Sequence, residues 1–435
     1  ASEKEQPAQI IISGGGIVGL TLALALQKRI GVTAEVYDQA SAFHDNIGAG
    51  MGMYPNGLRV LRDISPSLLD SIRKNGYPLV YRRFGRHDGT ETAVAEEAVL
   101  HESDHDLESI GICRWRLQKN LYDSVRKAGI PVYFGKRTFA VDTRNDGLVE
   151  VSFEDGTKRL TEMLFGAEGC KSKVRELVSG KKSKLEYTGV TCLMGMADLA
   201  RPERGMCLPQ ASTTKCHACF FPTLENEQCF QYYFPIETDK SNKESWGNLS
   251  KEVCKETCRN LAVKLRDDGW DEKYLEPLIN VRKALMIGFC ELKPNLEKWV
   301  YGEKGNIVLV GDAAHPPIPY TGQGAQMGLE DAGAIAMLLE KLCLKNKKYF
   351  DSDNVCLAMK LYEKMRIPRT VEINDHSTRL GMMQQRRADC SKFNNYKEEM
   401  IRREVFYHQH LPIMFPGVKY DYKEDVENMI HLECS

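Results

Sequence analysis

The start of the chain constrains its fold more than any other stretch. An apolar run, Gln9–Ser13, leads into the sequence GGGIVGL, in which Gly14, Gly16 and Gly19 have G-x-G-x-x-G spacing. An apolar, alanine-rich stretch follows, and the next run, TAEVYD, ends in Asp38. The order of strand, glycine turn, helix and second strand predicts a βαβ unit and a sheet of the α/β class.

Each glycine of this turn has its own physical reason. Gly14 permits the tight turn, Gly16 lets the backbone approach a pyrophosphate, and Gly19 lets helix and strand pack closely. The phosphates then meet free N–H groups at the positive end of the helix dipole. Asp38 can accept hydrogen bonds from a ribose diol. The unit predicts dinucleotide binding, although a glycine turn in an unrelated sheet is the alternative, and NAD and FAD are not distinguished.

Two further motifs lie downstream. GAEGCKSKVR, Gly166–Arg175, follows a hairpin-like stretch with an Asp-Gly turn. NIVLVGDAAHPPIPYTGQGAQMGLEDA, Asn306–Ala332, begins as an apolar strand that runs into Gly311 and Asp312. A proline-rich turn comes next, and the glycines of TGQGA open a helix.

These three motifs, in this order, resemble those of the group A flavoprotein monooxygenases, the single-component aromatic hydroxylases and their epoxidase relatives. The resemblance runs from about Gln9 to Tyr422, and YRRFGRHDGTE, YEKMRIPRT and YDYKED are similar to the fungal salicylate-hydroxylase-like branch. It implies non-covalent FAD, with NADPH or NADH as a transient co-substrate. It also implies O₂ chemistry through a flavin C4a-hydroperoxide, acting on a small aromatic or other apolar substrate.

The resemblance assigns roles to individual residues. Asp312 would hold a ribityl hydroxyl, and Arg114, in ICRWRLQKNL, would reach the ribityl-phosphate region. The helix opened by TGQGA would stabilise negative charge on reduced flavin. Glu168 stands where the family most often has aspartate and would help shape both cofactor pockets. The expected FAD-binding set is Gly14, Gly16, Gly19, Asp38, Ala49, Gly50, Arg114, Glu168, Gly311, Asp312, Gly322, Gln323, Gly324 and Ala325.

The family architecture is a Rossmann-like FAD-binding domain interleaved with a β-sheet substrate domain, followed by C-terminal helices. We place the FAD-binding domain at residues 1–80, 110–187 and 291–370, and the substrate domain at 81–109 and 188–290. Residues 371–435 form the C-terminal helical region. Strand-like runs and a helical stretch between about Thr188 and Cys290 suit a substrate sheet with helices beside it.

Four residues are candidates for the catalytic side of the site. Tyr232 and Tyr233 lie on opposite faces of one predicted strand, so one of them is expected to face the substrate. Tyrosines that merely pack the sheet are the alternative. Tyr320 and Pro319 lie together in the proline-rich turn, and the resemblance places Pro319 near the flavin carbon that reacts.

Two positions depart from the family. Met194 stands where other fungal members carry a catalytic arginine, and Tyr320 stands where bacterial salicylate hydroxylases carry histidine. A buried carboxylate or phenolate is costly without a cation or several donors. We therefore expect a neutral, mostly apolar ring, or a different polar anchor. Arg201 and Arg204 are possible substitutes, but RPERG has the composition of a surface turn. The sequence leaves hydroxylation, epoxidation, including that of indoles or terpenoids, and Baeyer–Villiger oxidation open.

Composition excludes several other classes. The net charge is −1, with no long run of one sign, so nucleic-acid binding has little support. No apolar run is long enough for a transmembrane helix, and the first residues lack the pattern of a signal peptide. The expectation is a cytoplasmic monomer or homodimer. A nicotinamide dehydrogenase and a non-catalytic prenyl-protein carrier of related fold are the rivals, and the intact TGQGA loop argues against both.

The chain has 14 cysteines, which we expect to be reduced. Cys216 and Cys219 have CxxC spacing but fall in a predicted strand, where residues three apart point to opposite faces. The cluster of His101, Asp104, His105 and Asp106 has the composition of a solvated loop. We therefore expect no metal site.

Overall fold

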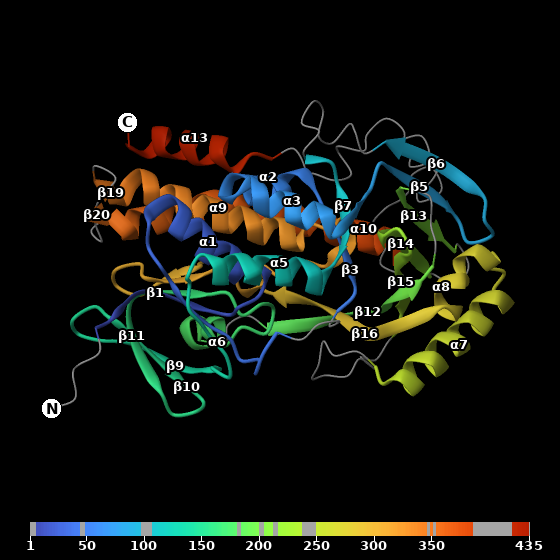
Figure 1. The fold of residues 1–435 in the computed structure, drawn as a ribbon, viewed down its shortest axis with the longest axis horizontal. Helices are drawn as coiled ribbons and strands as arrows, with labels where there is room; N and C mark the ends of the chain where they lie inside the picture. The colour runs from blue at the N-terminus through green and yellow to red at the C-terminus, as the bar shows by residue number, and fades with distance from the viewer. Residues whose placement is uncertain are drawn as a thin grey trace.

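The computed structural model describes residues 6–43, 48–96, 107–180, 184–199, 204–211, 216–236, 249–345, 349–350, 354–385 and 420–434. Two larger sheets and a layer of helices make up most of the molecule (Figure 1). The fold is the expected α/β class with C-terminal helices.

The first sheet has the strand order β17-β18-β11-β1-β2-β8, with β10 and β9 joined to it through β11. Its central strands β18, β11, β1, β2 and β8 are parallel. The strands are β1 (Ala8–Ser13), β2 (Glu35–Tyr37), β8 (Val132–Tyr133), β9 (Thr138–Thr143), β10 (Val149–Phe153), β11 (Lys158–Gly166), β17 (Val300–Tyr301) and β18 (Ile307–Leu309). The strands predicted at Gln9–Ser13, in TAEVYD and before Gly311, and the hairpin with the Asp-Gly turn, therefore form as expected.

Helices cover one side of this sheet, with the β9–β10 hairpin on the other (Figure 1). They are α1 (Ile17–Ile30), α2 (Pro55–Ile64), α3 (Pro66–Lys74), α5 (Arg114–Lys127), α9 (Gly324–Cys343) and α10 (Val355–Gln385). Helices α1 and α9 pack on each other, and both are buried on most sides because their sequences are apolar almost all round. The short α6 (Lys173–Ser179) follows β11, and α13 (Tyr422–Cys434) lies across α9.

The second sheet has the order β16-β12-β15-β14-β13-β5-β6 and is antiparallel except for the β13–β5 pair. Its strands are β5 (Tyr81–Arg86), β6 (Glu91–Glu96), β12 (Lys184–Asp198), β13 (Gly205–Gln210), β14 (His217–Leu224), β15 (Glu227–Pro235) and β16 (Val281–Lys293). Helices α7 (Lys251–Asp267) and α8 (Glu276–Ile279) lie beside it (Figure 1). A small third sheet contains β3 (Gly50–Met53), β4 (Gly76–Pro78) and β7 (Ile110–Cys113).

The two faces of the second sheet bury different side chains. Cys216 and Tyr232 pack in the cluster that includes α7 residues, whereas Cys219 and Tyr233 pack in a separate cluster on the other face. This arrangement confirms that the CxxC pair points to opposite sides and cannot hold one metal ion together. The HESDHD cluster, His101 to Asp106, lies outside the described residues.

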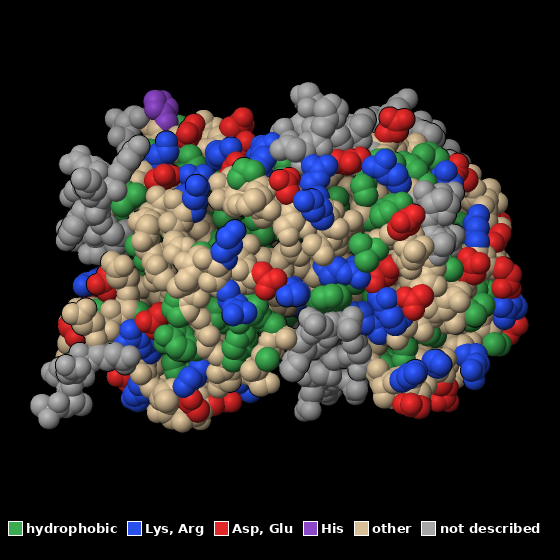
Figure 2. All heavy atoms as spheres, in the orientation of Figure 1, with side chains coloured by type: hydrophobic (Ala, Val, Ile, Leu, Met, Phe, Trp, Pro, Cys, Tyr) green, Lys and Arg blue, Asp and Glu red, His purple; other side chains and the backbone are tan. Residues whose placement is uncertain are grey.

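Two further observations concern the ends and the surface. Helix α10 runs without a break through residue 370, where our domain division separates the C-terminal region. Lys and Arg side chains alternate with Asp and Glu on the face drawn in Figure 2. Among the helices that the structure describes, none is long and apolar enough to cross a bilayer.

Candidate active site

The register of the first sheet brings the three glycine-containing motifs to one edge. Ser13 pairs with both Tyr37 and Gly166, and Gly166 pairs with Leu309, so these parallel strands end at the same level. The residues that follow each strand include Gly14, Asp38, Glu168 and Asp312. In open α/β sheets, ligands bind at this carboxyl edge.

The first glycine turn has the shape of a phosphate cradle. Gly14 has φ +110°, and a Cβ there would lie 2.4 Å from the carbonyl oxygen of Ala167. A Cβ at Gly19 would lie 1.9 Å from the carbonyl oxygen of Gly14. A Cβ at Gly16, by contrast, would meet nothing within 4 Å. Close packing therefore leaves no room for a side chain at Gly14 or Gly19. Gly16 borders open space, which a bound pyrophosphate requires.

Two helices present unsatisfied N-termini toward this edge. Helices α1 and α9 have no side-chain cap and no acidic residue in the first turn. Helices α2 and α5 share this feature, whereas Ser65, Ser172 and Ser250 cap the first turns of α3, α6 and α7. Free N–H groups and the positive end of a helix dipole favour an anion. The glycine turn before α1 and the start of α9 therefore fit an anionic dinucleotide such as FAD.

Arg114 and Asp312 carry opposite charges beside the cradle. Arg114 keeps an accessible side chain although protein surrounds it, as a residue that lines a cavity does. Burial lowers the pKa of Arg114, and the nearby carboxylates of Asp312 and Asp38 oppose that shift. Burial likewise raises the pKa of Asp312, against the influence of His315 and Arg114. The two groups therefore lie close enough for each charge to influence the other.

Two predicted acids have mainly internal partners. Asp38 accepts hydrogen bonds from the backbone N–H groups of Gly15 (2.7 Å) and Ala40 (2.8 Å), so it holds the glycine turn. Glu168 is bonded by the hydroxyls of Ser13 (2.9 Å) and Ser172 (2.7 Å) and by the N–H of Val174 (2.8 Å). The longer glutamate therefore joins the end of β1 to the start of α6.

The remaining predicted cofactor residues lie in three places: beside Arg114, after β18 and at the start of α9. Ala49 is buried and its carbonyl accepts from the N–H of Arg114 at 3.0 Å. A Cβ at Gly50 would collide with Cys229 of the second sheet, at 2.6 Å. Gly311 has φ +59° and begins the 3-10 turn Gly311–Ala313 that follows β18. Gln323 begins α9 and is fully buried, while Gly50, Gly322, Gly324 and Ala325 line a cavity.

Sequence reasoning missed two residues that hold these loops. Gln118 of α5 donates from Nε2 to the carbonyl of Gly15 at 3.1 Å. Arg175 of α6 donates to the carbonyls of Asp312 (3.3 Å) and Ala313 (3.1 Å) and also to Cys170. Arg175 is the last residue of the GAEGCKSKVR motif, and that position was the available sequence signal.

A cavity of about 650 Å³ connects this edge to the second sheet. Asp312, Pro319 and Tyr320 line its cofactor end. Aliphatic, sulfur-containing and aromatic side chains form much of the other end, including Leu185, Met194, Met206, Leu208, Cys219, Phe221, Tyr233, Met286, Ile287 and Phe289. Tyr232 is not brought to the cavity, because its hydroxyl donates to the carbonyl of Tyr274 on the far face.

Three aromatic rings, those of His217, Tyr233 and Tyr320, pack against one another in the cavity lining. His217 stacks on Tyr233 at 4.2 Å between ring centres and 5°, and Tyr320 lies 5.6 Å from His217 and 5.9 Å from Tyr233. Burial lowers the pKa of His217 to about 3, so the ring is neutral at physiological pH. His217 was not among our sequence candidates, although it lies between Cys216 and Cys219 in the run that we examined only for its cysteines.

Two cationic residues, Arg82 and Lys171, belong to the cavity lining, and Lys171, from the GAEGCKSKVR motif, is exposed. Arg82 belongs to the cavity wall but has no accessible surface, and its guanidinium lies 5.0 Å over the ring of Tyr54. Arg204 is an exposed residue that pairs with Glu108 at 3.5 Å, and Arg201 lies outside the described residues. Among the described residues, no group of three or more His, Cys, Asp or Glu side chains could hold a metal ion.

Comparison with known proteins defines the class. Residues 7–272 match the model of the FAD binding domain family, which is more than half of the chain, so the chain belongs to this family. 6-Hydroxynicotinate 3-monooxygenase of Bordetella bronchiseptica is 26% identical over 381 residues, covering 84% of this chain and 89% of that protein. The FAD-dependent monooxygenase paxM of Penicillium paxilli is 26% identical over 392 residues, covering 87% and 79%.

Solved structures share the whole fold. CtdE in complex with FAD and a substrate has a TM-score of 0.77 with 20% identity, and 98% of each chain is covered. Klebsiella pneumoniae HpxO with FAD and uric acid has a TM-score of 0.73 with 20% identity, covering 98% of this chain and 96% of that one. With the motifs and the relatives, these likenesses make this chain an FAD-dependent monooxygenase of group A.

Proposed function

We propose that this enzyme uses NADPH or NADH and O₂ to hydroxylate or epoxidise a small, neutral, mostly apolar ring compound. The observation that carries the proposal is the chemistry of the cavity beyond Tyr320. Met194 adds no charge there, and His217 is kept neutral by burial. Bound FAD supplies the redox chemistry, accepting two electrons from the nicotinamide and activating O₂.

The side chains of the cavity have separate tasks in this proposal. Tyr320 donates one hydrogen bond to a carbonyl or hydroxyl of the substrate. The stacked rings of His217 and Tyr233 provide a flat wall against which a planar substrate packs. The apolar lining excludes water from the reacting centre, and Pro319 borders the cofactor end.

Two relatives are named for carboxylated rings, 6-hydroxynicotinate and 3-amino-4-hydroxybenzoate. A ring of that kind brings a carboxylate that needs a cation or several donors when it is buried. Met194 offers neither, and Arg82 has no accessible surface. Lys171, the other cationic residue of the lining, belongs to the GAEGCKSKVR motif after β11 and not to the second sheet. We therefore propose that this enzyme differs from those relatives in the charge of its substrate.

Turnover with a substrate panel tests the proposal. NAD(P)H oxidation by the purified enzyme is measured with uncharged aromatic, indolic and terpenoid compounds and with salicylate, and products are identified by mass spectrometry. An uncharged ring that stimulates oxidation and is oxygenated with little peroxide is the expected result. Efficient, well-coupled turnover of salicylate would overturn the proposal.

We further propose that FAD is held non-covalently and that the enzyme works as a cytoplasmic monomer or homodimer. The fit of the glycine cradle and the two uncapped helices to a diphosphate and a flavin ring supports non-covalent binding. Acid precipitation should leave the yellow colour in the supernatant. Colour retained by the pellet would show a covalent bond.

A further inference from the structure

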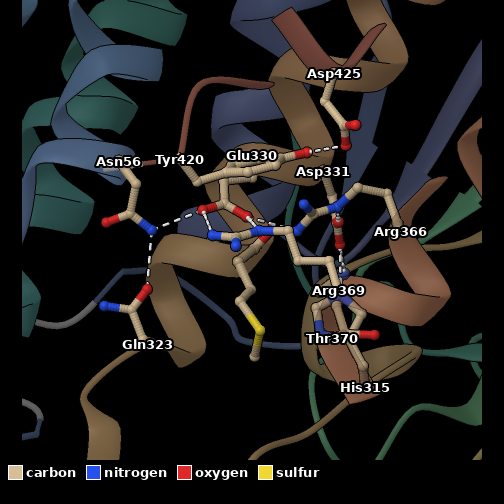
Figure 3. Close-up of polar contacts among 12 residues, drawn as sticks. Asn56, His315, Gln323, Glu330, Asp331, Arg366, Arg369, Thr370, Tyr420 and Asp425 are labelled. Atoms are coloured by element: carbon tan, nitrogen blue, oxygen red, sulfur yellow. Dashed lines mark hydrogen bonds and ion pairs between the residues drawn. The ribbon is translucent and has the colours of Figure 1, made fainter. Parts of the chain in front are cut away.

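A buried cluster of charged side chains lies between α9 and α10, beside the flavin-binding loops (Figure 3). Glu330 and Asp331 of α9 and Arg366 of α10 have no accessible surface, and Arg369 is mostly buried. Desolvating such charges is costly, and well-packed apolar residues often stabilise a core as much or more. The hydrogen bonds of these side chains to the flavin-binding loops explain why charged residues occupy this part of the core.

Asp331 holds the turn that carries Asp312. Its Oδ2 accepts from the N–H of Gly311 at 2.8 Å and contacts Nε2 of His315 at 2.6 Å. Its Oδ1 accepts from Nε of Arg366 at 2.7 Å. Both ends of the turn Gly311–His315 are thus attached to one carboxylate, and the pKa of Asp331 falls to about 2 because His315 and Arg366 outweigh its burial.

Glu330 reaches the N-terminus of α9 through Asn56 of α2. Nδ2 of Asn56 donates to Oε1 of Glu330 (2.6 Å) and to Oε1 of Gln323 (2.9 Å). Figure 3 shows Asn56 and Gln323 on one side of Glu330 and the two arginines on the other. The side-chain oxygen of Gln323 accepts the hydrogen bond from Asn56. The buried Nε2 of Gln323 has no hydrogen-bond partner in the protein.

The arginines connect the two carboxylates to each other. Arg366 bonds Asp331 through Nε and lies 2.8 Å from Glu330 through Nη2. Arg369 makes two hydrogen bonds to Glu330, of 2.8 and 2.6 Å, and its guanidinium lies 3.5 Å over the ring of Tyr420. Two guanidinium groups therefore neutralise two carboxylates.

We propose that Glu330, Asp331 and Arg366 are positioning residues for the flavin, fixing the Gly311–His315 turn and the start of α9 together. The pairing also keeps the region neutral, so that negative charge on reduced flavin meets no uncompensated carboxylate. The inference rests on FAD binding and not on the identity of the substrate. Its tests need no substrate, so their outcome is independent of whether the proposed reaction is correct.

Two substitutions separate charge from geometry. R366M leaves one carboxylate uncompensated, and the expected result is a lower FAD midpoint potential and an FAD Kd at least tenfold higher. R366K keeps the charge but loses the planar fork. It should keep the potential close to that of the wild-type protein while the Kd still rises.

R29M is the matched control, because Arg29 pairs with Glu340 at the other end of α9 (2.6 Å). Glu340 lies ten residues beyond Glu330, about 15 Å along the helix. R29M should leave the potential and the flavin spectrum as in the wild type. A potential that is unchanged in R366M, or that falls equally in R29M, would show a merely structural cluster.

A milder variant covers the case in which R366M does not fold. N56L leaves every charge in place but releases Gln323 from Glu330. We expect an FAD Kd at least threefold higher and a shifted flavin absorption band. If N56L and R366K both keep the wild-type Kd and spectrum, the proposal is wrong.

Discussion

The flavin half and the substrate half of the cavity region treat buried charge in opposite ways. Beside the flavin loops, Asp331 is ionised in the core because His315 and Arg366 hold its pKa near 2. At the substrate end, His217 is equally enclosed, and burial lowers its pKa to about 3, which leaves the ring neutral. Burial alone therefore does not decide whether a group is charged; the partner does.

This difference indicates how each half recognises the molecule that it binds. The cofactor half recognises a fixed, charged molecule, so its polar groups are paired and held in place. The substrate half recognises through shape and stacking, with Met194, Tyr233 and Phe289 in its wall. Changes that add or remove charge should thus have the largest effects, and of different kinds in each half.

The largest effect is expected from Asp312→Ala. A flavin hydroxyl left without its charged acceptor should cost roughly 1.5–3 kcal/mol, which is about tenfold to a hundredfold in the FAD Kd. Titration of the apoprotein with FAD measures it. Asp63→Ala is the control, because Asp63 bonds Tyr422 and Lys423 away from the cavity. Equal Kd values for Asp312→Ala and the wild type would refute the assignment.

Acid titration should separate the two halves into two pH windows. The pKa of His217 is lowered from 6.5 to about 3, so the unfolded chain binds its proton first. Its contribution to stability is therefore present above about pH 6.5 and is lost as pH falls toward 3. Asp331, lowered from 3.8 to about 2, loses its contribution only below about pH 4.

Melting temperatures of wild type and His217→Phe measure this separation. The variant should show a flatter decline between about pH 6.5 and 3 and the same decline below about pH 3. Parallel curves in the upper window would mean that His217 is not buried as a neutral ring.

A smaller effect is expected from Tyr320→Phe. The ring packs against Gly381 of α10, so the phenylalanine keeps the shape of the wall. Loss of one neutral hydrogen bond is worth about 0.5–1.5 kcal/mol, so product formed per NAD(P)H should fall about two- to tenfold while FAD binding stays the same. Tyr232→Phe, on the far face, should leave that ratio unchanged.

The smallest response is expected from the thiols. No disulfide joins the 12 cysteines whose side chains the structure describes, and Cys216 and Cys219 lie on opposite faces of their sheet. A thiol count in denaturant without reductant should approach 14 per chain. Zinc found at one per chain would contradict our interpretation of the CxxC spacing.

The sequence predicted the parts of the fold whose pattern is local. Glycine spacing and strand order located the cradle, and the two-residue period of a strand separated Cys216 from Cys219 and Tyr232 from Tyr233. The Asp331–Arg366 pair was out of reach because it joins two helices across 35 positions with no motif spacing. Its one local signal was an acidic pair, Glu330 and Asp331, in the middle of an otherwise apolar helix. His217 was missed because its neutrality depends on tertiary burial.

The most direct test of the account changes the charge of the substrate half and reads out the preferred substrate. Product per NAD(P)H is measured for a neutral phenol and for the same ring with a carboxylate, in the wild type and in Met194→Arg. The wild type should oxygenate the neutral ring with at least tenfold better coupling, and Met194→Arg should narrow or reverse that preference while its FAD Kd stays the same. Preference of the wild type for the carboxylated ring, or no response to the new cation, would contradict a neutral substrate site.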